Sequence, residues 1–368
     1  MERSYGVPHP GRNDVRCGYW RRLDCQPWGG THGDALIPEG RPLGWAILGT
    51  GTVSHAVASD LLSVNSAGRV AAWSRDFKNA TTFAAEHHFD RAYDSIVELL
   101  AAPDVDMVYV ATPHATHAEF AIAAVEAGKH VLIEKPIGVD AAEARAIAHA
   151  ARANGRFAME AMWMRFSPAY IALRADAAAG VLGELGSVRA SFGLPFGRPD
   201  SERWTSELHS STLLDQAIYA VTLARDILGE PTEVSSGATL RADGVDLTLQ
   251  ATLEFDGGRF AQLAASMVTY LEPSATISGT NGWATLAPPF WATDRYRRHA
   301  GNLGEAFGEP VDRIFPLEGS GYVPMLRAVQ DAVTAGSTQH PMHPLADSIA
   351  VMDLLDRIRS SWSPTASL

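Results

Sequence analysis

The ten residues WAILGTGTVS, at positions 45–54, show most clearly how this chain is organised. A short apolar run predicts a buried strand, and it leads directly into two glycines separated by one residue. Gly49 permits a tight turn, Gly51 lets the backbone approach a pyrophosphate, and the small Ser54 lets the next helix pack closely on the strand. The helix start would offer unpaired N–H groups to the phosphates. We therefore expect a dinucleotide to contact Gly49, Gly51, Thr52 and Val53.

Short apolar runs alternate with amphipathic stretches as far as residue 153. Further strands are predicted at 69–73, 107–111 and 130–133, and helices at 53–62, 79–87, 116–127 and 140–153. Strands that are buried on both faces and joined by helices form a parallel, right-handed, doubly wound sheet. We therefore predict an α/β fold with an N-terminal Rossmann domain over 43–162.

After residue 163 the pattern changes to consecutive strands joined by short turns. These strands are predicted at 187–194, 233–240, 246–255, 259–269 and 275–278, with helices at 169–179, 212–228, 325–335 and 345–358. This pattern predicts an α+β domain over 163–340 with an open, mainly antiparallel sheet. We expect residues 341–368 to form a helix that could pack back on the Rossmann domain. Residues 1–42 are rich in proline, lack apolar periodicity and are predicted to be a loose extension.

Composition excludes several classes of protein. The 368 residues include 42 acidic and 30 basic side chains, for a net charge of −12, which argues against binding to nucleic acid or to an anionic membrane. No run of 18 apolar residues is present, so no transmembrane helix is expected. Cys17 and Cys25 are the only cysteines, too few for a disulfide framework or a four-thiolate zinc site, and we expect a cytoplasmic location.

Two histidine pairs raise the question of a metal site. His114 and His117 are three residues apart, and His87 is followed by His88. In the sequence, no carboxylate or further histidine completes a ligand set for either pair. We therefore predict no metal.

The end of the second predicted strand indicates which dinucleotide is bound. Sites that prefer NAD carry an acid at this point, whereas this chain has Ser74 and Arg75 after Trp73. A guanidinium pairs well with a 2′-phosphate, so we predict a preference for NADP(H), with NAD(H) possible. Asp76 follows immediately and weakens the inference. The alternative is that Arg75 is only a solvated charge in a turn.

A lysine follows the predicted strand at 130–133, within Glu134-Lys135-Pro136. The carboxyl ends of parallel strands are where open α/β sheets bind ligands. A lysine there can hydrogen-bond a substrate oxygen and favour its developing negative charge during hydride transfer. The alternative is a surface lysine in a structural ion pair with Glu134.

Four motifs occur in an order that identifies a resemblance: residues 49–51, 112–117 (TPHATH), 128–136 (GKHVLIEKP) and 160–166 (EAMWMRF). Together they resemble the Gfo/Idh/MocA oxidoreductases over about residues 43–362. The segment at 160–166 and a later one at 213–219 resemble most the branch of that family that acts on dihydrodiols and aldose sugars.

The resemblance implies a catalytic group of Lys135, Asp215 and Tyr219. Asp215 and Tyr219 are four residues apart on a predicted helix, so they share a face. Tyr219 would donate or accept the proton, with its phenol tuned by the charge of Lys135, and Asp215 would orient the substrate or the lysine. Without the resemblance, both would be ordinary contacts of an amphipathic helix.

The remaining candidate residues are assigned by their place in the motifs. Near the nicotinamide, the resemblance implies cofactor contacts at Thr112, Pro113, His117, Glu134 and Lys135. A substrate pocket could be lined by Trp163, Arg165 and Phe192, although packing is nearly as good an interpretation of the two aromatic residues. Relatives usually carry a glycine run where this chain has residues 209–212 (HSST), which would narrow the approach to the pocket.

These observations predict an NADP(H)-dependent oxidoreductase. It would transfer a hydride between nicotinamide C4 and a secondary alcohol or carbonyl of a sugar or cyclic diol, and by resemblance it would form a homodimer through the open sheet. Two alternatives remain: an NAD-dependent hydrolase or lyase of the same family without net redox change, and a non-enzymatic nucleotide sensor.

Overall fold

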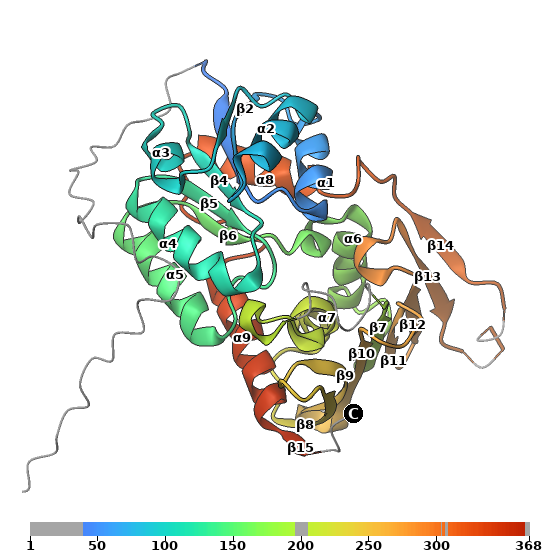
Figure 1. Ribbon diagram of the computed structural model, residues 1–368. Helices are drawn as coiled ribbons and strands as arrows, with labels where there is room; N and C mark the ends of the chain where they lie inside the picture. Colours follow the sequence, from blue (N-terminus) through green and yellow to red (C-terminus); the bar gives the residue numbers. More distant parts are fainter. Residues whose placement is uncertain (1–39, 196–204, 303, 306–307, 365–368) are drawn as a thin grey trace, which may run out of the picture. The chain divides into compact units, whose positions relative to one another are not determined.

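The computed structural model describes residues 40–195, 205–302, 304–305 and 308–364 (Figure 1). The proposed extension up to residue 39, with Cys17 and Cys25, lies outside the described residues. The described residues all belong to one compact unit. Within the described ranges, no helix combines the length and the apolar character needed to cross a bilayer.

The predicted Rossmann sheet is confirmed. Six parallel strands lie in the order β3-β2-β1-β4-β5-β6, which is the usual order for two mononucleotide-binding halves. Their bounds are β1 Leu43–Leu48, β2 Ala67–Trp73, β3 Arg91–Tyr93, β4 Met107–Val110, β5 His130–Ile133 and β6 Ala158–Glu160. Every residue of β1 and β4 is buried, as expected for strands covered on both faces. The short β3 and β6 were not predicted.

Helices cover both faces of this sheet (Figure 1). Right-handed crossovers place the helices of the β1-to-β3 half on one face and those of the β4-to-β6 half on the other. The helices are α1 Thr52–Leu61, α2 Phe77–Glu86, α3 Ile96–Ala101, α4 His117–Glu126 and α5 Ala141–Ala153. Asp140 caps α5 by accepting a hydrogen bond from the Glu143 N–H at 2.9 Å.

The second sheet has nine strands in the order β14-β13-β12-β11-β7-β10-β9-β8-β15. The pairs β7–β10 and β8–β15 are parallel and the others antiparallel, which confirms a mainly antiparallel sheet. The bounds are β7 Leu185–Gly193, β8 Glu233–Leu240, β9 Asp246–Phe255, β10 Arg259–Ser266, β11 Ala275–Gly279, β12 Gly282–Leu286, β13 Arg295–Ala300, β14 Val311–Ile314 and β15 Trp362–Pro364. β10 therefore ends three residues earlier than predicted.

The remaining helices pack against both sheets. They are α6 Pro168–Ala178, α7 Ile218–Leu228, α8 Val323–Thr334 and α9 Leu345–Ser360, with a π-helical turn over Leu213–Ala217 before α7. Five 3-10 turns complete the described elements, over His114–Thr116, Trp163–Phe166, Ser206–Leu208, Asp256–Gly258 and Phe290–Ala292. α7 lies against β7 and β10, and α9 lies against both α5 and β8.

Helix α8, which precedes the C-terminal helix α9, packs on the Rossmann part of the chain. The buried indole N–H of Trp45 in β1 donates to Gln330 Oε1 at 2.9 Å, and Gln330 Nε2 donates to the carbonyl of Ser66 at 2.6 Å. Just before α8, the N–H groups of Ser320 and Tyr322 donate to the carboxylate of Asp60 on α1. Residues 319–334 are therefore joined to α1, β1 and the turn before β2.

Candidate active site

The glycine turn between β1 and α1 fits a dinucleotide. Gly49 has φ +102°, and a Cβ atom there would lie 2.4 Å from the Ala111 carbonyl oxygen, so only glycine is tolerated. Gly51 caps α1 without a side-chain hydrogen bond, and a Cβ there would meet no protein atom within 4 Å. The first turn of α1 contains no acid. There is thus open space beside the start of α1, as binding of a pyrophosphate by its N–H groups requires.

Ser74 and Arg75 follow β2 directly, and Arg75 is exposed. The neighbouring Asp76 uses its carboxylate to cap α2, accepting a hydrogen bond from the Lys78 N–H at 2.8 Å. The Asp76 carboxylate, which weakened the inference from the sequence, is therefore engaged in capping α2.

The loop after β4 is held by His117, whose side chain is fully buried. Its Nδ1 lies 2.7 Å from the Pro136 carbonyl oxygen and its Nε2 lies 2.8 Å from that of Thr112. Burial lowers the pKa of His117, and the two carbonyl contacts oppose that shift. His117 thus joins the loop of Thr112 and Pro113 to the loop that carries Lys135, with both of its nitrogens facing main-chain oxygens.

Lys135 and Asp215, eighty residues apart in sequence, form an ion pair. Lys135 Nζ lies 2.7 Å from Asp215 Oδ1 and 2.9 Å from the Asp215 carbonyl oxygen. Burial by itself would lower the pKa of Lys135, but the charge and hydrogen bond of Asp215 outweigh it and the pKa is raised. The ammonium therefore stays charged at neutral pH, and its third N–H is not used by Asp215.

Tyr219 completes this group, and its ring lies under Lys135 Nζ at 5.1 Å from the ring centroid. Its hydroxyl accepts a hydrogen bond from the Trp163 indole N–H at 2.9 Å. Because an indole can only donate, the phenol hydrogen is left for another acceptor. Burial, with a further contribution from Glu134, raises the pKa of Tyr219 well above its ordinary value. We expected the charge of Lys135 to tune this phenol, but burial is the dominant influence and keeps it protonated.

Asp215 lies on a π-helical turn rather than on the regular helix predicted over 212–228. Such turns are rare and occur often at functional sites. The turn is anchored by the buried Asp246, whose Oδ2 accepts a hydrogen bond from the Leu213 N–H at 2.7 Å. Just before it, His209 adopts a left-handed conformation with φ +52°, which glycine normally takes. Of the residues that replace the glycine run, His209 thus keeps the backbone conformation that a glycine would adopt there.

Glu134 is buried beside this group rather than paired with the side chain of Lys135. Its Oε1 accepts a hydrogen bond from the Tyr109 hydroxyl, and its Oε2 accepts one from the Lys135 backbone N–H at 3.2 Å. Burial raises the pKa of Glu134 to about 7, although the hydrogen bond from Tyr109 and the charge of Lys135 act in the opposite direction.

This raised pKa predicts how the Glu134→Gln substitution alters the pH dependence of stability. A carboxyl with a higher pKa in the folded than in the unfolded state binds more protons when folded, so its stabilisation is complete below the unfolded pKa and is lost as the pH rises through about 7. Between pH 5 and pH 8, the free energy of unfolding of the wild type should therefore fall relative to that of Glu134→Gln. Urea denaturation measures this difference. A difference that stays flat between pH 5 and pH 8 would contradict the prediction.

Aromatic side chains surround Tyr219. Phe192, from β7, stacks on Trp291 with ring centroids 3.7 Å apart, and Trp291 lies 5.5 Å from Tyr219. Trp163 stacks on Tyr322 at 4.6 Å, where a Cβ on the adjacent Gly321 would lie 2.6 Å from the indole. Trp163 and Phe192 were predicted site residues, whereas their stacking partners Tyr322 and Trp291 come from distant segments without a motif and were not predicted.

His114 was also missed as a site residue, although it belongs to the TPHATH motif. Its ring lies 5.6 Å from that of His117. Burial, together with the neighbouring His117 and the charge of Lys135, lowers the pKa of His114 to about 3, and the charge of Asp215 opposes this shift. A neutral imidazole therefore lies close to the ion pair.

Arg165 corrects one prediction, because it lies in a buried ion-pair network rather than in a substrate pocket. Its guanidinium is 1% exposed and pairs with both carboxylate oxygens of Asp226. The same group donates to Asp347 at 2.8 Å and contacts His343 at 2.8 Å. All of these partners lie more than 60 residues away in the chain, so they could not be recognised from sequence spacing.

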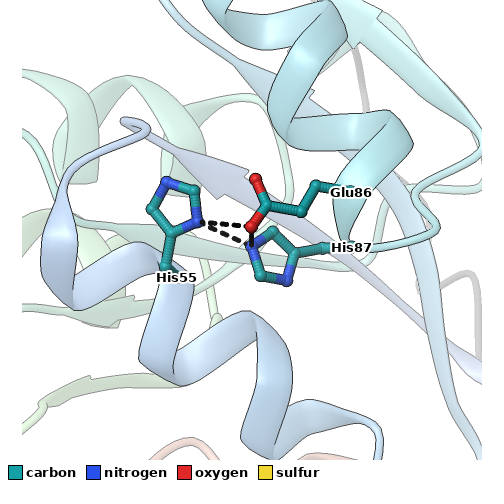
Figure 2. Close-up of side chains that lie close together, drawn as sticks. All are labelled: His55, Glu86 and His87. Carbon is teal, nitrogen blue, oxygen red and sulfur yellow. Dashed lines mark hydrogen bonds and ion pairs between the residues drawn. The ribbon is translucent and has the colours of Figure 1, made fainter.

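The prediction that no carboxylate or further histidine joins His87 is wrong. The fold brings His55 of α1 and Glu86 of α2 next to His87, with one ligand atom of each within 4.8 Å of the others (Figure 2). A further histidine and a carboxylate thus complete a set of three. The spacing of 31 residues between His55 and Glu86 hid this cluster in the sequence.

Comparison with known proteins gives matches to both parts of the chain. The family model described as an oxidoreductase family with an NAD-binding Rossmann fold matches residues 43–162, and the GFO/IDH/MocA C-terminal domain matches residues 170–285. Among solved structures, a 3-ketoreductase from Actinomadura kijaniata with bound NADP and TDP-benzene has a TM-score of 0.78 and 26% identity, covering 88% of this chain and 98% of that one. A levoglucosan dehydrogenase solved with NADH and levoglucosan, at 20% identity and a TM-score of 0.77 over 87% and 96% of the two chains, shows the fold alone.

Curated relatives match along almost their whole length. Trans-1,2-dihydrobenzene-1,2-diol dehydrogenase of Macaca fuscata fuscata is 33% identical over 329 residues, which cover 88% of this chain and 98% of that protein. The human protein of the same name is 32% identical over 328 residues with the same coverage. The chain therefore belongs to the Gfo/Idh/MocA oxidoreductases, a family whose N-terminal domain is an NAD-binding Rossmann fold.

Proposed function

We propose that this chain is an NADP(H)-dependent oxidoreductase that interconverts a secondary alcohol and a carbonyl on a cyclic diol or a sugar. The observation that carries the proposal is the meeting of Lys135, Asp215 and Tyr219 beside the carboxyl end of β5. In a parallel sheet of this order, that edge also bears the glycine turn after β1. A charged amine, a carboxylate and a protonated phenol are the groups that such a reaction uses.

Each of the three residues has a distinct role in the proposal. When bound, the nicotinamide supplies or accepts the hydride at its C4 carbon. The remaining N–H of Lys135 Nζ hydrogen-bonds the substrate oxygen and stabilises its negative charge as the hydride moves. The Tyr219 hydroxyl, held protonated by burial, gives its proton to that oxygen during reduction. Asp215 keeps the lysine charged and in position.

The substrate class rests on the relatives and on the lining of the site. The curated relatives are named for a cyclic dihydrodiol, and aromatic rings of Trp163, Phe192 and Trp291 gather around Tyr219. Apolar walls with a few polar groups suit a ring that carries hydroxyls. A panel of cyclic diols, aldoses and ketosugars, followed by NADPH absorbance, tests the proposal. No turnover on the whole panel, or cofactor retained through gel filtration and unchanged in net redox state, would count against it.

The preference for NADP(H) is part of the proposal. Arg75 is exposed after β2, and Asp76 is occupied as the cap of α2, so a 2′-phosphate would meet a cation rather than a carboxylate. We expect Arg75→Ala to raise the KM for NADP by about tenfold or more, because hydrogen bonds to charged groups contribute about 1.5–3 kcal/mol. The KM for NAD should change little.

Steady-state kinetics with each cofactor measure the effect of Arg75→Ala. Arg152→Ala, at an exposed residue of α5 whose end lies at the opposite edge of the sheet, provides the matched control and should alter neither KM. An unchanged preference in Arg75→Ala would exclude the proposed role of this residue.

A homodimer formed through the open face of the nine-stranded sheet is proposed on the resemblance. Gln250, Glu254 and Gln262 are exposed on that face of β9 and β10. The strongly apolar surface that would have supported a dimer independently is thus not found at these positions. Light scattering of the purified protein decides the oligomeric state.

A further inference from the structure

Three side chains that can bind a metal ion converge between α1 and the end of α2 (Figure 2). His55 lies near the start of α1, Glu86 is the last residue of α2, and His87 caps that helix. Their side chains point toward one another from the two helices. The proposed reaction uses none of them, so the cluster requires a separate explanation.

The three ligand atoms form a triangle of the size that a transition-metal ion requires. His55 Nδ1 lies 2.8 Å from His87 Nε2 and 3.6 Å from Glu86 Oε1. The distance between His87 Nε2 and Glu86 Oε1 is 3.8 Å. A circle through three points at these separations has a radius of about 2.0 Å, so one point is about 2.0 Å from all three atoms. Zinc bonds to imidazole nitrogen and carboxylate oxygen are about 2.0–2.2 Å long.

The direct contact between the two imidazoles is the one that an ion would replace. Without an ion, one ring donates an N–H to the other. Two ligands of a tetrahedral zinc ion lie about 3.3 Å apart, so the rings need to separate by only about half an ångström. Phe83 packs against both rings, with centroids 4.9 Å from that of His55 and 4.6 Å from that of His87, and limits how far they can turn.

The ligand types select the class of ion. Two imidazoles and one carboxylate suit Zn²⁺ and similar transition metals, whereas Ca²⁺ and Mg²⁺ require oxygen ligands. The side chains of His55 and Glu86 are 41% and 55% exposed, while that of His87 is 8% exposed. An ion can therefore enter from solvent, bind the buried His87 together with the two exposed ligands, and keep a water molecule as its fourth ligand.

We propose that His55, Glu86 and His87 form a binding site for a divalent transition-metal ion, best matched by Zn²⁺, that ties α1 to α2. α1 begins at the glycine turn and α2 begins just after Arg75. The ion thus fixes the relative position of the two elements that are proposed to hold the two ends of the dinucleotide's adenosine diphosphate part. The site itself does not depend on the proposed reaction.

Isothermal titration calorimetry of the full chain with Zn²⁺, after treatment with a chelator, tests the site. We expect His55→Ala and Glu86→Gln to weaken the binding of one ion by at least about tenfold, because each removes one of three ligands. Zn²⁺ should also raise the Tm of the wild type, and this rise should be lost in both variants. Both side chains are largely exposed, so neither substitution opens a cavity in the core.

Two matched variants separate this site from other ligands of the chain. His149→Ala replaces an exposed histidine of α5, and a Cys17→Ser/Cys25→Ser variant removes both thiols. Both should bind the ion as tightly as the wild type. Equal binding by wild type, His55→Ala and Glu86→Gln, or loss of binding only in the cysteine variant, would overturn the proposal. The contact between His55 and His87 would then be a plain hydrogen bond.

Discussion

Replacement of Lys135 by methionine should lower kcat/KM by about 10³-fold, equivalent to about 4 kcal/mol of transition-state stabilisation. The ammonium pairs with Asp215 and lies over the Tyr219 ring, and its removal takes away the charge that we propose stabilises the substrate oxygen. Methionine keeps most of the side-chain volume. The loss should therefore appear in kcat, while the dissociation constant of NADP, measured by fluorescence, changes only a few-fold.

A matched control for this substitution is the lysine at the other end of β5. Lys129 precedes β5 at its amino end, as Lys135 follows it at its carboxyl end, and its Nζ donates to the Ala102 carbonyl oxygen at 2.9 Å. Lys129→Met should keep kcat within about threefold, because ligands bind at the carboxyl edge of such a sheet. Full turnover by Lys135→Met on an identified substrate would refute the catalytic assignment.

Arg165→Ala should reduce the free energy of unfolding by about 3–5 kcal/mol, the usual cost of leaving one member of a buried ion pair without its partner. Asp226 would stay buried, with only the Tyr170 hydroxyl, at 2.9 Å, among the groups described here left to compensate its charge. Arg165→Lys should restore little, because an ammonium lacks the planar five-donor fork with which the guanidinium reaches Asp226, Asp347 and His343 at the same time. Urea denaturation measures the loss.

Arg145→Ala is the control for that experiment. Arg145 also donates two hydrogen bonds to one aspartate, Asp353, but the two side chains are 54% and 45% exposed. Solvent screens this pair, and its removal should have no measurable effect on stability. An Arg165→Met/Asp226→Asn variant, which removes both buried charges, should recover part of the loss. A loss of less than about 1 kcal/mol for Arg165→Ala would show that the buried network does not stabilise the fold.

The parts of the fold that follow from local sequence were predictable. The turn from β1 into α1 needs glycine at Gly49 for backbone reasons that a sequence displays, and the buried strands around it are continuous apolar runs. β3 and β6 have three residues each, too short for any periodicity, and the parallel pairing of β7 with β10 depends on contacts between distant segments. These features were therefore missed.

The candidate site divides in the same way. Lys135 was identified from its motif, and its approach to Asp215 and Tyr219 was expected only from the resemblance. The π-helical turn that carries Asp215 makes an anchoring contact with a distant part of the chain, since the Leu213 N–H donates to Asp246, and sequence spacing does not reveal this contact. Arg165 was misassigned because an arginine among aromatic residues looks like a ligand-binding group until its buried acidic partners are known.

The return of residues 319–334 to the Rossmann sheet has a consequence for protein synthesis. Trp45, near the start of the sheet, reaches its hydrogen-bond partner only at Gln330, 285 residues later. A ribosome that has released the whole parallel sheet has therefore not yet released the helix that covers part of it. The nascent domain waits for about the last eighth of the chain before the indole N–H of Trp45 finds its partner, so a shortened chain that stops before α8 would leave an apolar face for chaperones and proteases to recognise.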